Sequence, residues 1–84
     1  MEMMMDNEHI IIKDHTTGKQ IWESYTLFHK VQDILWKYEQ KYYGYVDFEA
    51  FTVAGDPKEI WIFYHYRPEH PKKEKELIEM LEAM

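Results

Sequence analysis

Cysteine is absent from this chain of 84 residues, and Ser24 is its only serine. Without thiols there is no disulfide bond and no thiolate ligand for a metal, and the common nucleophiles of covalent catalysis are nearly missing. The three glycines are scattered, so the chain has no glycine-rich phosphate loop. We therefore expect a protein that is not an enzyme, with no catalytic residues and no cofactor.

Basic charge is also scarce, since 16 acidic residues face 10 Lys and Arg and the formal net charge is −6. A nucleic-acid binder presents a basic face to phosphates, so we expect no DNA or RNA partner. The acidity is compatible with solubility alone or with a basic partner protein. No apolar run approaches the roughly 20 residues of a membrane span. The start MEMMMDNE lacks the basic and long apolar regions of a signal peptide. We expect a cytoplasmic protein without a membrane contact.

Aromatic residues are abundant instead, at 17% of the chain, and many of them lie in Tyr45–Tyr66. Two runs of β-branched and aromatic residues flank Gly55–Lys58, whose Gly, Asp and Pro are typical of a turn, so the segment predicts a β-hairpin. Both faces of this hairpin carry large apolar side chains, whereas an antiparallel sheet with one wet face alternates more cleanly. A chain this short has a thin core, so apolar side chains in excess of what one buried face needs indicate association with another chain.

The register of this hairpin depends on its charged residues. Pairing Glu49 with His65 and Asp47 with Arg67 makes opposite charges neighbours, and each pair stabilises by about 0.2–1 kcal/mol. A slip of one residue exchanges these partners. We expect the charge-paired register.

The remaining elements follow from shorter patterns. We expect a flexible arm at residues 1–8, strands at His9–Lys13 and Gln20–Tyr25 around a loop at Asp14–Lys19, a helix at Leu27–Tyr42, and a last helix that begins at Pro71. Residues 9–84 then form a single α+β domain of order ββαββα. Lys19–Tyr25 and Lys58–Tyr64 share Lys, Ile, Trp and Tyr, a weak repeat that chance also produces. Two like halves predict a four-stranded antiparallel sheet with two helices packed on one face.

The helix at Leu27–Tyr42 carries apolar residues at helical spacing. Thr26 is the expected N-cap, with Ser24 as the alternative, and Gly44 ends the helix. Its core stripe is Leu27, Phe28, Val31, Ile34, Leu35, Tyr38 and Tyr42. The stripe of the last helix is Leu77, Ile78, Leu81 and Met84.

A second stripe lies opposite the core stripe of the first helix. His29, Trp36 and Tyr43 are spaced by seven, and Gln32 flanks them. Because Trp and Tyr are enriched among interface anchors, this stripe predicts a partner-binding strip. The alternative is that Trp36 lies over lysine stems or under the N-terminal arm.

The open face of the sheet is the rival surface. Trp61 and Phe63 lie on it in either register, and Phe51 joins them in the charge-paired one. If both helices cover the other face, this one exposes an apolar patch large enough to imply a partner. Aromatics on an open sheet also resemble single-stranded RNA platforms, but few basic residues surround them. We expect self-association here and a homodimer.

The five histidines are scattered and predict no metal site, because zinc needs three or four convergent ligands. Glu49, His65 and Asp47 lie close enough to converge, but a cross-strand ion pair explains them more simply. These observations favour a small acidic protein that binds another protein, an inhibitor or adaptor of the type that phages and mobile elements encode.

One version of this hypothesis has the protein block a nucleic-acid-binding host protein by acidic mimicry. The candidate acids for it are Asp47, Glu49, Glu74, Glu76, Glu79 and Glu82. The alternative function is a small-ligand or metal-dependent enzyme with its site at a homodimer interface, using His65 and Glu49.

Overall fold

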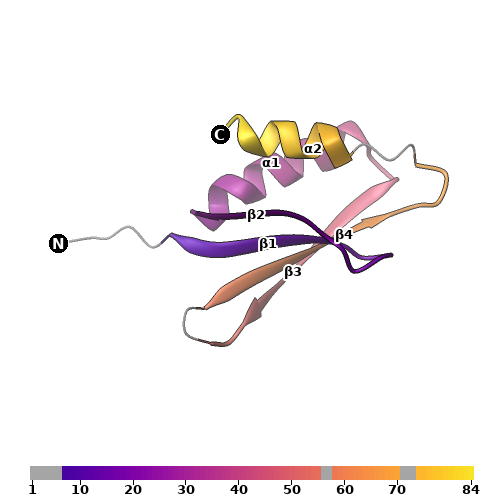
Figure 1. The fold of residues 1–84 in the computed structure, drawn as a ribbon. Coiled ribbons are helices and arrows are strands. Elements are labelled where there is room, and N and C mark those ends of the chain that lie inside the picture. Colours follow the sequence, from indigo (N-terminus) through magenta and orange to yellow (C-terminus); the bar gives the residue numbers. More distant parts are fainter. Residues whose placement is uncertain (1–6, 56–57, 71–73) are drawn as a thin grey trace.

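The computed structural model describes residues 7–55, 58–70 and 74–84 (Figure 1). The elements are β1 (Glu8–Asp14), β2 (Gln20–Thr26), α1 (Phe28–Lys41), β3 (Val46–Val53), β4 (Glu59–Tyr66) and α2 (Glu74–Glu82). The α+β class and the order ββαββα are confirmed. Of the arm expected at residues 1–8, residues 1–6 lie outside the described part, and Glu8 belongs to β1. Neither of the two described helices is long and apolar enough to cross a membrane.

The four strands form one sheet with the order β2-β1-β4-β3. Each hairpin is antiparallel, but the central strands β1 and β4 run parallel, with Ile10 opposite Ile60. The sheet is therefore mixed, and the expectation of an antiparallel sheet throughout is wrong at this pair. The central strands β1 and β4 contain most of the buried strand residues, whereas β3 carries Asp47 and Glu49 and lies at an edge with most of its residues exposed.

The weak repeat does not mark equivalent elements. Lys19–Tyr25 lies largely in the edge strand β2, and Lys58–Tyr64 lies largely in the central strand β4. Trp22 is buried on the helix side of the sheet, opposite Ile12. Trp61 lies on the open face, opposite Phe51. The shared residues therefore reflect two amphipathic strands rather than two like halves.

The register of β3 and β4 differs from the expected one by two residues. Asp47 lies opposite His65 and Phe51 lies opposite Trp61. A shift of two leaves every side chain on its expected face, so the face assignments hold. The apolar cross-strand pair outweighs the exposed charge pairs on which the expectation rested. Glu49 still reaches His65 diagonally, with 3.1 Å between carboxylate and imidazole.

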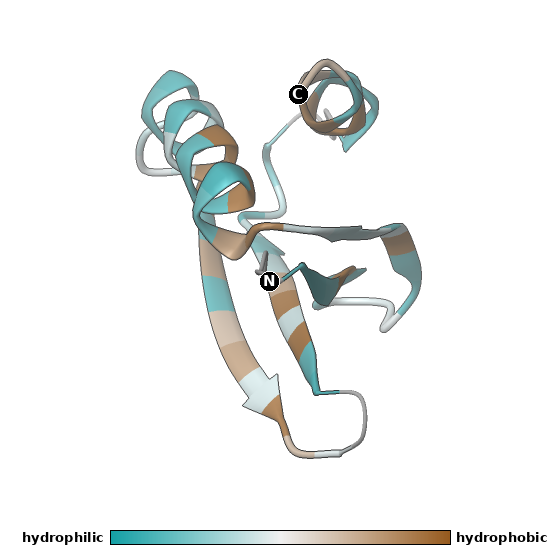
Figure 2. Cartoon of the chain, turned by 90° about the vertical axis from the view of Figure 1, so that its left-hand side faces the viewer, coloured by the Kyte–Doolittle hydropathy of each residue, from teal (hydrophilic) through white to brown (hydrophobic). Residues whose placement is uncertain are grey.

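Both helices pack on one face of the sheet, as predicted. Figure 2 shows α1 above the side formed by β3 and β4, and α2 above the side formed by β1 and β2. The far end of the β3–β4 hairpin projects beyond both helices (Figures 1 and 2). This projection leaves part of β3 without a helix above it.

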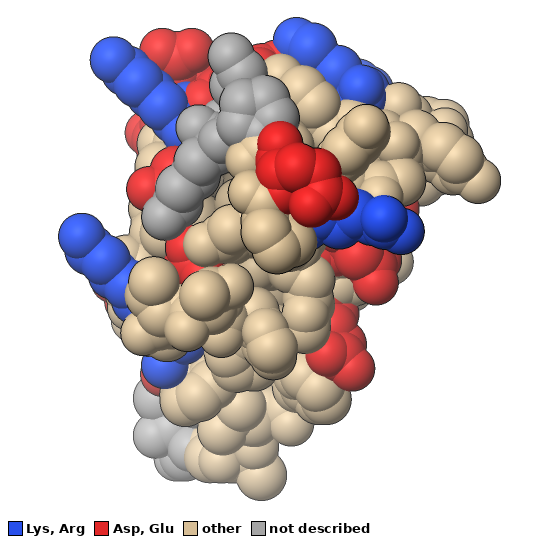
Figure 3. All heavy atoms as spheres, turned by 90° about the vertical axis from the view of Figure 1, so that its right-hand side faces the viewer, with Lys and Arg blue, Asp and Glu red and all other residues tan. Residues whose placement is uncertain are grey.

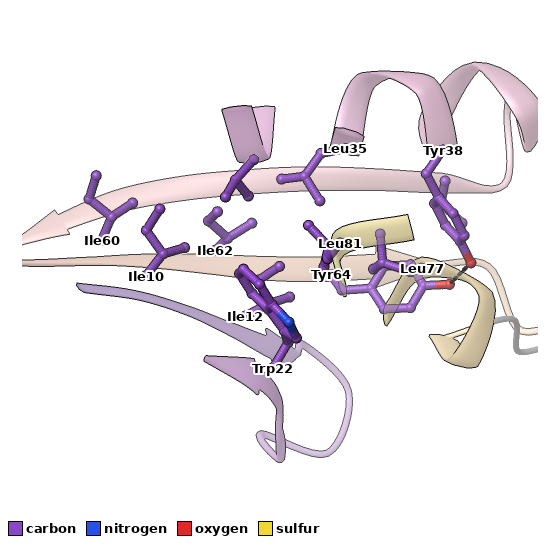
Figure 4. Close-up of a cluster of buried hydrophobic side chains, with 12 residues drawn as sticks. Ile10, Ile12, Trp22, Leu35, Tyr38, Ile60, Ile62, Tyr64, Leu77 and Leu81 are labelled. Carbon is purple, nitrogen blue, oxygen red and sulfur yellow. Dashed lines mark hydrogen bonds between the residues drawn. The ribbon is translucent and has the colours of Figure 1, made fainter. Parts of the chain in front are cut away.

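The core fills the layer between the helices and the sheet (Figure 4). Its fully buried side chains include the strand residues Ile10, Ile12 and Ile62 and the helix residues Val31 and Leu77. At one end of the core the hydroxyl groups of two buried tyrosines meet, as the dashed line in Figure 4 shows. The predicted apolar stripe of α1 is confirmed, since all its members from residue 28 onward are buried or pack against the core.

The ends of α1 differ from the sequence prediction. Leu27 is the N-cap and no side chain caps the helix, because Thr26 is the last residue of β2. At the other end Tyr42 is the C-cap, and its amide donates to the Tyr38 carbonyl. Gly44 follows two residues later with φ +86°, a conformation that favours glycine.

The last helix confirms part of its predicted stripe. Leu77 and Leu81 are buried and Ile78 packs against the core, but Met84 is 48% exposed and Met80 packs in its place. Met84 lies beyond the last residue of α2, so it no longer follows the helical spacing. The expected start at Pro71 lies outside the described residues. The Trp22 indole N–H donates to Glu82 at 2.6 Å and fixes α2 to β2.

Candidate functional site

A groove of about 220 Å³ lies between α1 and β3. The buried residues Leu35 and Ile62 form its floor, and Phe48 and Ala50 form its strand side. The small side chain of Ala50 leaves room between α1 and β3. The groove is apolar at the bottom and open to solvent at the top.

Trp36 stands at the rim of this groove and is 61% exposed. Its ring makes no aromatic, cation–π or side-chain hydrogen-bond contact in residues 7–55, 58–70 and 74–84. Most of its ring surface is therefore open to solvent. A large apolar side chain held beside an apolar groove is an anchor type found at protein interfaces.

The predicted partner-binding strip lies only partly at the groove. Gln32 and Trp36 line it, whereas His29 and Tyr43 are exposed but do not. Tyr43 is 80% exposed and lies beyond the end of α1. The structure thus brings two of the four predicted residues to one concave surface.

Two carboxylates stand close together at one end of the groove. Glu39 on α1 lines it, and Asp47 on β3 lies beside Glu39. Desolvation and then the neighbouring Asp47 carboxylate raise the pKa of Glu39, and the main-chain amide of Phe48 lowers it in part. The proximity of like charges gives this end of the groove a preference for a cation.

The strand side of the groove is also a free sheet edge, since no strand pairs with β3 on its outer side in the described part of the chain. The Arg67 amide donates to the Tyr45 carbonyl at 2.9 Å. Odd-numbered residues of β3 therefore bond to β4, and the N–H and C=O groups of the even-numbered residues point outward. Ala50 and Thr52 are exposed and present such groups.

The open face of the sheet brings together the three residues predicted for self-association. Phe51 pairs with Trp61, and the rings of Phe51 and Phe63 lie 5.8 Å apart. Only Phe51 is largely exposed, at 47%, because other side chains of the same face cover the rest. The Lys13 ammonium lies 3.8 Å over the Trp61 ring, and the Trp61 indole N–H donates to Glu59 at 2.8 Å.

Histidines cross-link the strands on this open face. His9 of β1 bonds to Glu23 of β2 and, at 3.1 Å, to Glu59 of β4, and its ring stacks on Tyr25 at 4.4 Å. These contacts join side chains of three strands. The described residues contain no group of three or more His, Cys, Asp or Glu that could hold a metal.

A second hollow, of about 390 Å³, lies where β3 begins and β4 ends. Asp47, His65 and Arg67 line it, and it is shallow and wide open. The His65 ring bonds to Glu49 and packs at a tilt against His15, with 3.9 Å between ring centres. An enzyme site would need a deep pocket around His65, and this shallow hollow does not provide one within a single chain.

The sequence did not reveal a polar network within the core. The Tyr38 and Tyr64 hydroxyls lie 2.8 Å apart, and Nε2 of the buried His70 lies 3.1 Å from the Tyr64 hydroxyl. The buried Asp14 accepts a hydrogen bond from Tyr66 at 2.9 Å. Burial raises the pKa of Tyr38 and of Tyr64, so both stay neutral. The only sign of this network in the sequence is the presence of tyrosines at helix-facing positions of β4.

Charge is mixed on the surface. Figure 3 shows one face on which acidic and basic side chains lie next to one another, with no continuous basic area. Comparison with known proteins finds no family model, no curated protein and no solved structure that matches the chain. Function must therefore be inferred from these surfaces.

Proposed function

We propose that this chain is a small acidic, non-enzymatic protein-binding module whose groove between α1 and β3 receives part of another protein. The observation that carries the proposal is Trp36, which is 61% exposed at the rim of an apolar groove and makes no aromatic, cation–π or side-chain hydrogen-bond contact with the described residues. Burying an aromatic ring of this size contributes strongly to binding, and Trp is enriched among residues that dominate interfaces.

The charge distribution indicates which partners fit. Glu39 and Asp47 place negative charge beside the groove, and the net charge is −6. Such a surface favours a partner segment that combines apolar and basic side chains. An inhibitor or adaptor of phage or mobile-element type, acting in the cytoplasm on a host protein, fits this size and charge.

Acidic mimicry of nucleic acid receives less support than direct recognition of a basic segment. On α2, Glu82 accepts from Trp22, and Glu76 bonds to Lys41 and Tyr42. These two carboxylates are used in contacts within the fold. Mimicry of nucleic acid would instead need a regular row of acids free to contact a partner. The proposal therefore places recognition at the groove rather than on α2.

Self-association through Phe51, Trp61 and Phe63 is the second part of the proposal. The three rings lie on one broad face, and such a face is readily self-complementary about a two-fold axis. A homodimer formed there leaves the groove accessible, because the groove opens on the helix side of the sheet.

Site-specific photocrosslinking tests the proposed binding site. A benzophenone amino acid replaces Gln32, at the groove rim, and in a matched control replaces Lys30, on the side of α1 that faces α2. In lysate of the source cell we expect a discrete adduct from position 32, none from position 30, and loss of the adduct with Trp36→Ala. Equal labelling from both positions, or no adduct from position 32, contradicts the proposal.

A further inference from the structure

We propose that the free edge of β3 pairs with an extended segment of the partner, which adds a fifth strand to the sheet and directs a Lys or Arg side chain to Glu39 and Asp47. This inference rests on the function proposed above and specifies what the groove recognises. The occupant is an extended strand, with apolar residues facing the groove and basic residues at its acidic end.

The first support is the state of the edge itself. β3 is eight residues long, its register with β4 is continuous, and it contains no proline. Proteins commonly protect such an edge with lysine, proline, a bulge or a covering element. Here Ala50, Phe51 and Thr52 are exposed in succession, and the outward main-chain groups of Ala50 and Thr52 are ready to pair with a new strand.

The other edge of the sheet differs in these respects. β2 shows a register shift between Ile12 and Lys13 of its neighbour β1, and α2 is fixed to it through Trp22 and Glu82. A bulge twists an edge and interrupts regular pairing. The free edge suited to strand addition is therefore that of β3.

The second support is the position of the groove beside this edge. Side chains of an added strand alternate between the two faces of the sheet. Those on the helix side enter the space between Ala50 and Trp36, where apolar residues are favoured. Trp36 then covers side chains of the added strand, and pockets for alternate side chains give specificity in strand addition.

The third support is charge. Glu39 lies beside Asp47, and Glu49 follows on the same strand. A Lys or Arg of the added strand relieves the repulsion between the first two carboxylates, and Arg offers a bidentate contact. A second copy of this chain would instead bring its own β3 acids and a further net charge of −6 to the edge. The electrostatics therefore favour a basic partner over self-pairing.

The test uses a library of random linear dodecapeptides, displayed on phage and selected on the immobilised full chain. We expect enriched sequences that alternate apolar and polar residues and carry Lys or Arg. A synthetic peptide from this pool should bind with an affinity that fluorescence anisotropy measures directly. N-methylation of alternate amides on its pairing side should abolish binding. Enrichment of i, i+3, i+4 helical patterns, of acidic peptides or of nothing overturns the inference.

Thr52→Pro provides the matched test in the protein. The Thr52 N–H points away from β4, so proline there preserves the β3–β4 ladder and blocks the outer edge. Thr52→Ala retains the N–H and serves as the control, and circular dichroism verifies both folds. We expect Thr52→Pro to weaken the peptide at least about tenfold and Thr52→Ala to leave it unchanged, since one or two hydrogen bonds are lost. Equal affinity for both variants contradicts strand addition.

The same peptides separate this inference from the proposed function. If Trp36→Ala abolishes binding and Thr52→Pro does not, the groove binds protein but not as a strand, and only the inference fails. If Trp36→Ala leaves binding unchanged, the groove proposal itself fails. If light scattering shows that Thr52→Pro converts a dimer into a monomer, the edge belongs to a second copy and the inference is wrong.

Discussion

Trp36 and Trp61 were both expected at interfaces, yet the structure treats them differently. Trp61 lies under the Lys13 ammonium of the neighbouring strand β1 and donates its indole N–H to Glu59 of its own strand, so both its ring face and its polar group have partners. Trp36 has neither type of contact and is 61% exposed. The comparison shows that an aromatic outside the core is not equivalent to an aromatic available for binding. The contacts that an aromatic side chain already makes within the protein determine how much binding free energy it can contribute to a partner.

The largest effect is expected for Trp61→Ala. The variant loses packing against Phe51 and Phe63 and the contact with Lys13, so the free energy of unfolding should fall by about 2–3 kcal/mol, less than for a fully buried Trp. Urea denaturation followed by circular dichroism measures this, and Trp61→Phe should recover most of it. In light scattering the wild type should have about twice the chain mass, and Trp61→Ala should shift toward the monomer. A steady monomer mass for the wild type refutes the homodimer.

Trp36→Ala should reverse this pattern. Truncation of a hot-spot tryptophan weakens the partner by about 2 kcal/mol or more, while the free energy of unfolding stays within about 0.5 kcal/mol of wild type. Titration calorimetry with the partner protein identified by crosslinking at position 32 measures the binding free energy. Urea denaturation measures the free energy of unfolding. If Trp36→Ala unfolds the protein, Trp36 belongs to the core, and the contrast between the two tryptophans disappears.

Lys13→Met sharpens the comparison on the side of Trp61. Methionine retains the length of the lysine stem but removes the cation over the ring, which should lower the free energy of unfolding by about 0.5–1 kcal/mol. Lys30→Met changes an exposed lysine of α1 and serves as the control. An identical loss in both variants would attribute the effect to net charge rather than to the contact with Trp61.

The smallest effect concerns the acidic end of the groove beside Trp36. The pKa of Glu39 is raised on folding, so the folded state holds this proton more tightly and stability falls as pH rises through the raised pKa. Glu39→Gln removes this loss and should stabilise the protein at pH 7 by about 0.5 kcal/mol or less, because solvent screens the pair. The gain should vanish below the ordinary glutamate pKa. Melting curves at pH 7 and pH 3.5 check the sign, and a gain at the lower pH contradicts it.

Local patterns could be predicted from the sequence because they depend on neighbours along the chain. The apolar stripe of α1 follows from helical spacing, and the faces of Phe51, Trp61 and Phe63 follow from strand alternation. The register of β3 and β4 could not be predicted, because a shift of two residues preserves every face. The parallel pairing of β1 with β4 satisfies the same alternation as an antiparallel pairing, so the sequence pattern does not distinguish the two.

Long-range contacts explain the remaining misses. Asp14 was expected in a loop, and its burial depends on Tyr66, which lies 52 residues further along the chain. His70 lies between β4 and α2, and it is buried against Tyr64. Predicting the groove would require the position of α1 relative to β3, and the periodicity of the sequence does not contain this position. Of the candidate site, the exposure of Trp36 could be predicted, but its concave surroundings could not.

The parallel contact between β1 and β4 also has a consequence for folding. It joins residues about fifty positions apart, such as His9 and Glu59, whereas each hairpin closes locally. Contacts of such separation slow folding, because the entropy of closing the long loop is lost before the contacts can stabilise the chain. Until this pairing forms, each half of the chain exposes a strand that is central in the native sheet, and such an edge attracts other strands. Two fragments divided at Gly44 should therefore associate with each other to restore the sheet rather than persist as separate folded units.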